Sequence, residues 1–104
     1  MFLALWEYEV KSGSEEKFEE VYGSDGGWAR LFRRARGYRG TRLVRDAKNQ
    51  RVYMTMDYWD SREEYEKFRM DFRAEYEALD KIGDELTVRE MRIGHFQEVQ
   101  LRSD

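Results

Sequence analysis

The stretch RVYMTMDYWDSREEYEKFRMDF, Arg51–Phe72, changes from a strand pattern to a helix pattern within a few residues. Its first half mixes β-branched, aromatic and methionine side chains, which favour a half-buried strand. After Trp59, large apolar residues recur every three or four positions as far as Ile82, which is typical of an amphipathic helix. Ser61 and Glu64 have the spacing of a capping box and mark the start of this helix. A strand that runs directly into a capped helix, with a tryptophan at the junction, predicts a pocket between the two.

The rest of the chain supplies three more strands and a helical region that glycines interrupt. The predicted strands are Phe2–Val10, Tyr38–Arg45, Arg51–Trp59 and Thr87–Val99, and the predicted helices are Glu15–Tyr22, a short segment from Trp28 to near Gly37, and Ser61–Ile82, which is expected to end at Gly83. Strict alternation along the last strand would place on one face Arg89, Met91, Ile93, His95, Gln97 and Val99.

This order of elements, β-α-β-β-α-β, predicts a ferredoxin-like α+β fold in which helices cover one face of a four-stranded antiparallel sheet. The opposite face is apolar as well, because Leu3 and Leu5 alternate with the inward-facing residues of the first strand. A lone copy would leave these side chains in water. We therefore expect a homodimer that packs sheet face to sheet face.

The composition describes a small core inside a heavily charged surface. Of the 104 residues, 40% are hydrophobic, 39% are charged and 15% are aromatic, and the formal net charge is −3. This length suits one core, so a single domain over residues 1–104 is expected. The acidic balance argues against nucleic-acid binding. Because the sequence contains neither a signal peptide nor a long apolar run, we expect a soluble cytoplasmic protein without a membrane partner.

One stretch departs from the acidic balance, because it is rich in arginine and contains no acid before Asp46. It permits two interpretations: a solvated helix and strand face, or a patch that binds an acidic ligand or a partner's carboxylates. The arginines are Arg30, Arg33, Arg34, Arg36, Arg39, Arg42 and Arg45.

The residue inventory excludes several chemistries. With no cysteine, the chain has no thiolate nucleophile and no cysteine-based zinc site. His95 is the only histidine and has neither a nucleophile motif nor metal-ligand spacing around it, so it is either a packing residue or a ligand contact. Asp57 shares a strand face with Thr55 and Trp59. It either pairs with an arginine or, if that face lines a closed pocket, becomes a base whose pKa burial raises.

Three segments in this order, LWEYEV before a Gly-Ser turn, WARLFRRARGYRGTRLVRD and YWDSREEYEKF, resemble the antibiotic biosynthesis monooxygenase superfamily of dimeric α+β barrels over residues 2–96. The resemblance implies several activities, because members include cofactor-free oxygenases that convert polycyclic phenols or anthrones to quinones with O₂, as well as haem-degrading enzymes. In the quinone-forming branch, Trp59 and Tyr65 match implicated residues, but the asparagine position holds Thr55. In the haem-degrading branch, Trp6 stands near the expected asparagine and the long helix lacks a histidine, which argues against haem degradation.

The resemblance therefore implies a cofactor-independent monooxygenase that oxidises a polycyclic phenol or anthrone in an aromatic pocket between sheet and helices, with no metal or other cofactor. Its catalytic residues would be Trp59 and Tyr65. Its pocket is expected to be lined by Trp6, Trp28, Phe32, Thr55, Asp57, Phe68, Phe72 and His95. Aromatic walls of this kind suit a flat small molecule.

Three other interpretations remain open from the sequence. The first is a non-catalytic homodimer of the same fold that binds a small molecule or is structural. The second is an engineered catalyst on this scaffold, because proline and cysteine are both absent. The third is an RNA-recognition motif, which shares the strand order but is disfavoured because Arg51–Tyr58 lacks the glycine and the middle aromatic residue of that motif.

Overall fold

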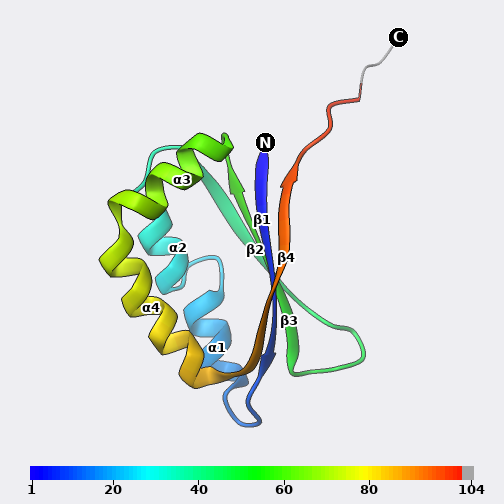
Figure 1. The fold of residues 1–104 in the computed structure, drawn as a ribbon. Helices are drawn as coiled ribbons and strands as arrows, with labels where there is room; N and C mark the ends of the chain where they lie inside the picture. The colour runs from blue at the N-terminus through cyan, green and yellow to red at the C-terminus, as the bar shows by residue number, and fades with distance from the viewer. Residues whose placement is uncertain (102–104) are drawn as a thin grey trace.

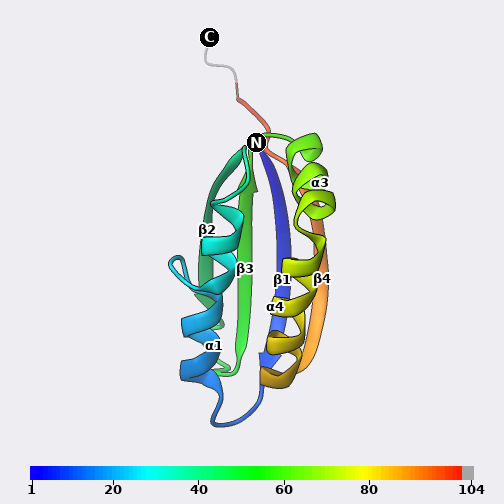
Figure 2. The ribbon, with the colours of Figure 1, turned by 90° about the vertical axis from the view of Figure 1, so that its left-hand side faces the viewer.

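The computed structural model describes residues 1–101, and in it every helix lies on one face of a four-stranded antiparallel sheet (Figure 1, Figure 2). The spatial order of the strands is β2-β3-β1-β4, which confirms the predicted ferredoxin-like arrangement. The elements are β1 Phe2–Val10, α1 Glu15–Tyr22, α2 Gly27–Phe32, β2 Tyr38–Arg45, β3 Val52–Trp59, α3 Arg62–Asp71, α4 Arg73–Leu86 and β4 Thr87–Gln97.

The two central strands bury alternate residues against the helices, as their sequence pattern predicts. In β3, buried and half-buried positions alternate without interruption from Val52 to Trp59. Each residue of β3 lies opposite a residue of β1, so that Trp59 pairs with Phe2, Asp57 with Ala4 and Thr55 with Trp6. The helix-covered face of the sheet therefore carries both large rings and polar side chains in one continuous row.

The long helix predicted over Ser61–Ile82 is two helices, and the prediction of one continuous helix is wrong. Ser61 does cap α3, because its hydroxyl accepts a hydrogen bond from the Glu64 amide at 3.2 Å. The helix then breaks at Phe72, whose φ of −116° and ψ of 30° lie outside the helical range. The apolar stripe continues through the break, because Phe68 and Phe72 stay stacked at 5.5 Å. No helix within residues 1–101 is long and apolar enough to cross a membrane.

Gly83 does not end the second helix, as the sequence pattern suggested, because α4 continues to Leu86. A Cβ atom at Gly83 would lie 1.9 Å from the hydroxyl oxygen of Tyr22 on α1. Glycine at this position therefore lets α4 approach α1 closely, and it is a packing residue and not a helix stop.

A bulge in β4 overturns the predicted alternation of that strand. Leu5 pairs with Gly94 and Trp6 with Arg92, so Ile93 has no partner in β1 and the facing of the strand reverses there. His95 consequently pairs with Ala4 and lies on the helix-covered face, away from the face of Arg89 and Met91. The strand also ends at Gln97, earlier than the predicted Val99.

Candidate functional site

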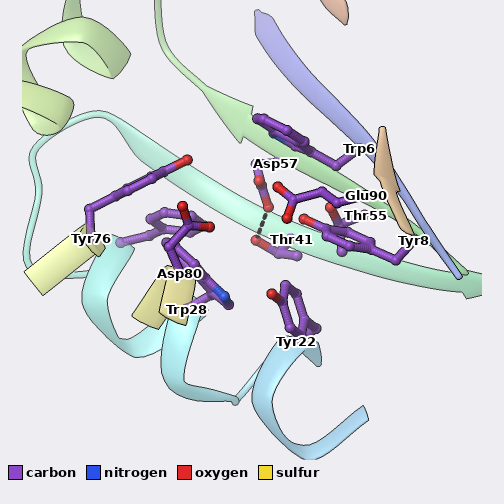
Figure 3. A pocket seen from close by; sticks show the side chains of 11 residues that line it. Trp6, Tyr8, Tyr22, Trp28, Thr41, Thr55, Asp57, Tyr76, Asp80 and Glu90 are labelled. Atoms are coloured by element: carbon purple, nitrogen blue, oxygen red, sulfur yellow. Dashed lines mark hydrogen bonds between the residues drawn. The ribbon is translucent and has the colours of Figure 1, made fainter. Parts of the chain in front are cut away.

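A small cavity lies between the helix-covered face of the sheet and helices α1, α2 and α4 (Figure 3). Its volume is about 30 Å³. Aromatic rings form most of its wall, and threonines and carboxylates supply its polar groups. The lining residues are Trp6, Tyr8, Tyr22, Trp28, Phe32, Thr41, Thr55, Asp57, Tyr76, Asp80 and Glu90. This set contains five residues expected from the sequence: Trp6, Trp28, Phe32, Thr55 and Asp57.

Asp57 is the polar centre of the cavity, with a side chain that is 8% exposed. It accepts a hydrogen bond of 2.8 Å from the Thr41 hydroxyl, and that hydroxyl also contacts the Tyr38 hydroxyl at 2.7 Å. Burial raises the pKa of Asp57 from 3.8 to about 7, and the hydrogen bond from Thr41 offsets part of the rise. Within residues 1–101 no arginine pairs with Asp57, so the expected ion pair is absent. The carboxyl can accept or release a proton near neutral pH.

Three neighbouring strands create the space that Asp57 faces. In the sheet, Ala4 lies beside it on β1 and Thr41 lies beside it on β2. Because these neighbours are small, they leave room where larger side chains would fill the interior. The cavity therefore follows from small residues at one level of the sheet.

The rim of the cavity is acidic, a feature that local sequence patterns do not reveal. The carboxylates of Asp80 and Asp84 on α4 and Glu90 on β4 lie within 4.8 Å of one another. Burial raises the pKa of Asp80, and the nearby Asp84 raises it further. Burial also raises the pKa of Glu90, with Asp80 and Asp84 as additional causes. In the sequence, the four-residue spacing of Asp80 and Asp84 predicts only that these two lie on one helix face. Glu90 joins them because α4 packs on β4, which the sequence pattern does not show.

The other predicted site residues lie outside this cavity, in a closely packed aromatic cluster beneath α3. Trp59 is fully buried, with its ring 5.5 Å from Phe32 and 5.2 Å from Phe68. Tyr65 packs against Trp59 at 5.6 Å, and Phe72 stacks on the outer side of Phe68. Phe32 both lines the cavity and contacts Trp59, so it connects the two regions.

His95 lies at the edge of the same cluster and also does not line the cavity. Its ring is 5.2 Å from those of Phe2 and Tyr65. The Nε2 atom is buried and has no hydrogen-bond partner among residues 1–101. Burial lowers the pKa of His95, and Arg92 lowers it further. A half-buried imidazole that contacts two aromatic rings fits the packing interpretation of this residue.

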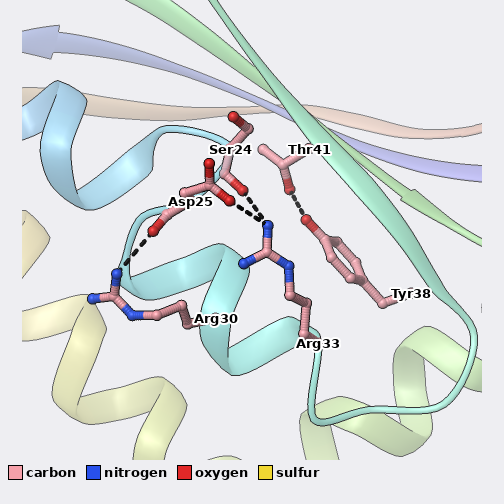
Figure 4. A network of polar contacts seen from close by, with 6 residues as sticks. All are labelled: Ser24, Asp25, Arg30, Arg33, Tyr38 and Thr41. Carbon is pink, nitrogen blue, oxygen red and sulfur yellow. Dashed lines mark hydrogen bonds and ion pairs between the residues drawn. The ribbon is translucent and has the colours of Figure 1, made fainter.

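Most side chains of the arginine-rich stretch bind oxygen atoms of the chain itself, and Figure 4 shows two of them. Arg33 donates hydrogen bonds to the Ser24 carbonyl at 2.7 Å and to the Asp25 carboxylate at 2.8 Å. Arg30 donates to the Asp25 carbonyl at 2.8 Å. Further ion pairs join Arg34 to Glu75, Arg39 to Asp60, and Arg45 to Glu19. These contacts within the chain favour the interpretation as a solvated helix and strand face over a patch for acidic ligands.

The fold and the cavity define a class of protein: a small α+β domain that encloses an aromatic site under the helices of a ferredoxin-like sheet. The family model described as antibiotic biosynthesis monooxygenase matches residues 1–71, and the chain belongs to this family. The matched region includes Asp57 and, of the aromatic cluster, Trp59, Tyr65 and Phe68. Asp80 and Glu90 on the rim lie beyond it.

Solved structures with the same fold include several that carry the name of this family. One, from Bordetella bronchiseptica, is 24% identical with a TM-score of 0.73, and the match covers 95% of this chain and 97% of that chain. Another, from Nitrosomonas europaea, is 12% identical with a TM-score of 0.74 and coverages of 96% and 100%. SnoaB from Streptomyces nogalater, a cofactor-independent oxygenase, is 19% identical with a TM-score of 0.70 and coverages of 99% and 97%. No curated protein matches the sequence.

Proposed function

We propose that this protein is a cofactor-independent monooxygenase that oxidises a polycyclic phenol or anthrone with O₂, and that Asp57 is its general base. The observation that carries the proposal is a carboxyl buried in an aromatic cavity with its pKa raised to about 7. A general base is most effective when its pKa lies near the working pH. Membership of the monooxygenase family and the likeness of the fold to the oxygenase SnoaB support the same chemistry.

The proposed reaction needs no reductant other than the substrate. Asp57 takes the phenolic proton, and the resulting phenolate is electron-rich enough to pass an electron to O₂. One oxygen atom forms the new carbonyl of a quinone. The other leaves as water, with the phenolic hydrogen and the hydrogen of the oxidised carbon. The protein binds the substrate, promotes its ionisation and excludes solvent.

The site must open to admit such a substrate. A cavity of about 30 Å³ has room for about two water molecules, whereas an aromatic ring is larger. On the outer side of the helices lies a groove of about 620 Å³ that shares Tyr76 and Asp80 with the cavity. We infer that the substrate enters from this groove when these two half-buried side chains on α4 move. In this scheme Trp59 and Tyr65, the residues implied by the resemblance, support the cavity wall through Phe32 and do not touch the substrate.

The proposal is tested by following quinone absorbance with naphthol and anthrone substrates in the presence of O₂. Asp57→Asn should lower the rate by about a hundredfold, the effect typical of losing a general base. Asp71→Asn, which removes an exposed carboxylate on α3, is the matched control and should leave the rate unchanged. Equal rates for the wild type and Asp57→Asn would contradict the role of Asp57.

The proposed assembly is a homodimer through the face of the sheet that the helices leave uncovered. Val44 on β2 and Met91 and Phe96 on β4 are each more than two-fifths exposed on that face, at 43%, 47% and 47%. Exposed apolar side chains gathered on one face are typical of an interface between copies. Light scattering should show a dimer for the wild type and a monomer for Phe96→Glu, and a monomeric wild type would contradict this assembly.

The small cavity volume also favours a second candidate function, a non-catalytic homodimer that binds a small molecule or is structural. The two candidates differ in turnover and not in assembly. A dimer that forms no quinone above the background rate from any phenol or anthrone tested would support the second candidate.

A further inference from the structure

The rim of the cavity carries charges that the proposed reaction does not use. Asp80 on α4 and Glu90 on β4 line the cavity together with Asp57, so three carboxylates converge on one small space. None of the lining residues in the described part of the chain is a lysine or an arginine. Arg69 lies just outside the lining, with its guanidinium 4.1 Å from the centre of the Tyr76 ring, and it offsets part of the rise in the pKa of Asp80. Asp84 adds a further negative charge next to Asp80 and Glu90. A confined site with charges of one sign attracts a ligand of the opposite sign.

The aromatic wall favours an organic cation over a hydrated metal ion. Tyr22, Trp28 and Tyr76 come from three helices and line the helix side of the cavity, where Asp80 also lies (Figure 3). The rings of Trp28 and Tyr76 meet edge to face at 4.8 Å. Aromatic faces attract ammonium groups and offer apolar surface to the carbon atoms of a ligand. A metal ion would have to replace its water ligands with oxygen atoms, and rings provide none.

A buried donor in the same wall forms no well-aligned hydrogen bond within residues 1–101. Trp28 is only 8% exposed, and the Tyr22 hydroxyl lies within reach of its Nε1 atom without forming such a bond. Buried N–H groups in folded proteins almost always have a partner. An ammonium group cannot accept this hydrogen bond, but an oxygen atom on the same ligand can. The cavity therefore favours a ligand that carries both a positive charge and an oxygen atom that accepts a hydrogen bond.

We propose that the substrate is a phenol bearing a protonated amine, with the ammonium group between Asp80 and Glu90 and the phenolic oxygen close to Asp57 and Trp28 Nε1. The phenol part of this inference rests on the proposed function, whereas the ammonium site rests on the rim itself. Both rim carboxylates lie beyond the part of the chain that the family model matches.

Three probes of similar shape and different charge test the inference by calorimetry near pH 7. They are tyramine, which is cationic, 4-propylphenol, which is neutral, and 3-(4-hydroxyphenyl)propionate, which is anionic. Tyramine should bind at least about tenfold more tightly than 4-propylphenol, because an unscreened charge pair at a partly buried rim contributes at least this factor. The anion should bind most weakly. Equal affinities for tyramine and 4-propylphenol, or no binding of tyramine, would overturn the inference.

Substitutions of the rim carboxylates test whether the preference for the cationic probe comes from Asp80 and Glu90. Asp80→Asn and Glu90→Gln should each weaken tyramine binding about tenfold and leave 4-propylphenol binding unchanged. Glu85→Gln removes an exposed carboxylate from α4 outside the cavity and should change neither affinity. Circular dichroism of each variant checks that it is folded. Loss of affinity for both probes in the rim variants would indicate a structural role and contradict the assignment.

Further outcomes distinguish the ammonium site from a metal site and from the proposed oxidation reaction. If Ca²⁺ or Mg²⁺ alone displaces tyramine at micromolar concentration, the rim is a metal site and the inference fails. Charge selectivity without quinone formation would leave the ammonium site in place and remove the proposed reaction. Quinone formation from neutral phenols without charge selectivity would support the proposed reaction and contradict the ammonium site.

Discussion

Two regions of the helix-covered sheet face are rich in aromatic rings: the region beneath α3, which is filled (the filled end), and the region around Asp57, which holds the cavity (the hollow end). Beneath α3, Phe2, Trp59 and Phe68 are at most 2% exposed and pack ring against ring. Beneath α1 and α4, equally large rings surround a cavity of about 30 Å³. The sheet contributes to the difference, because Thr41 and Thr55 line the hollow end, whereas Phe2 and Trp59 stand at the filled end.

The comparison shows which region is built for stability and which for chemistry. Rings in van der Waals contact stabilise the filled end through burial and dispersion. The hollow end instead buries a carboxyl group whose one side-chain hydrogen bond within residues 1–101 comes from a hydroxyl, which costs stability whenever the group is charged. Perturbed carboxyl groups in cavities are typical of functional sites.

The largest expected difference is in stability after truncating one tryptophan from each end. Trp59→Ala should lower the free energy of unfolding by about 3–5 kcal/mol, because it leaves a void in a filled core. Trp6→Ala removes a half-buried ring beside an existing cavity and should cost about half as much. Urea denaturation measures both values. Equal losses would mean that the two ends are packed alike.

The second prediction concerns the pH dependence of stability. The folded pKa of Asp57 is raised, so the folded state binds the proton more tightly than the unfolded state. Its stabilising contribution is fully present below about pH 4 and is lost as the pH rises to about 7, by roughly 4 kcal/mol at most. Asp57→Asn should remove this loss and be more stable than the wild type above pH 7. If urea denaturation gives both proteins the same pH profile, the carboxyl is not buried as described.

The smallest effect concerns the contact that holds α4 against the hollow end. Gly83→Ala should destabilise the protein by about 1–2 kcal/mol, because the new methyl group meets the Tyr22 hydroxyl, although alanine favours the helix itself. In a Tyr22→Phe background, which lacks that hydroxyl, the same change should be close to neutral. Thermal unfolding of the four proteins gives the coupling. An equal cost in both backgrounds would show that Gly83 does not approach Tyr22.

Local patterns in the sequence predict the strands, the start of α3 and the inward face of β3. Asp57 and Thr55 could be placed on the same face because alternation in a strand is set by neighbouring residues. The break at Phe72 could not be predicted, because neither proline nor glycine marks it. From the sequence alone, Gly83 is interpreted as the end of a helix. The position of Tyr22 shows that it is a packing residue.

The acidic rim was beyond sequence reasoning for the same reason. Asp80 and Glu90 come together only when α4 packs on β4, and Glu90 faces the cavity through its pairing with Tyr8. The bulge at Ile93 likewise depends on how β4 meets β1. Contacts between distant elements thus decided the parts of the site that were missed, whereas contacts within one element decided the parts that were found.

The most direct test of the account is the titration of the Asp57 carboxyl carbon by carbon-13 NMR, with Asp57→Asn used to assign its signal. A midpoint near 7 is expected, because this carboxyl is buried and forms no ion pair with a lysine or arginine within residues 1–101. A midpoint near the ordinary value of 3.8 would mean that water or a cation reaches Asp57, and would contradict its role as the base.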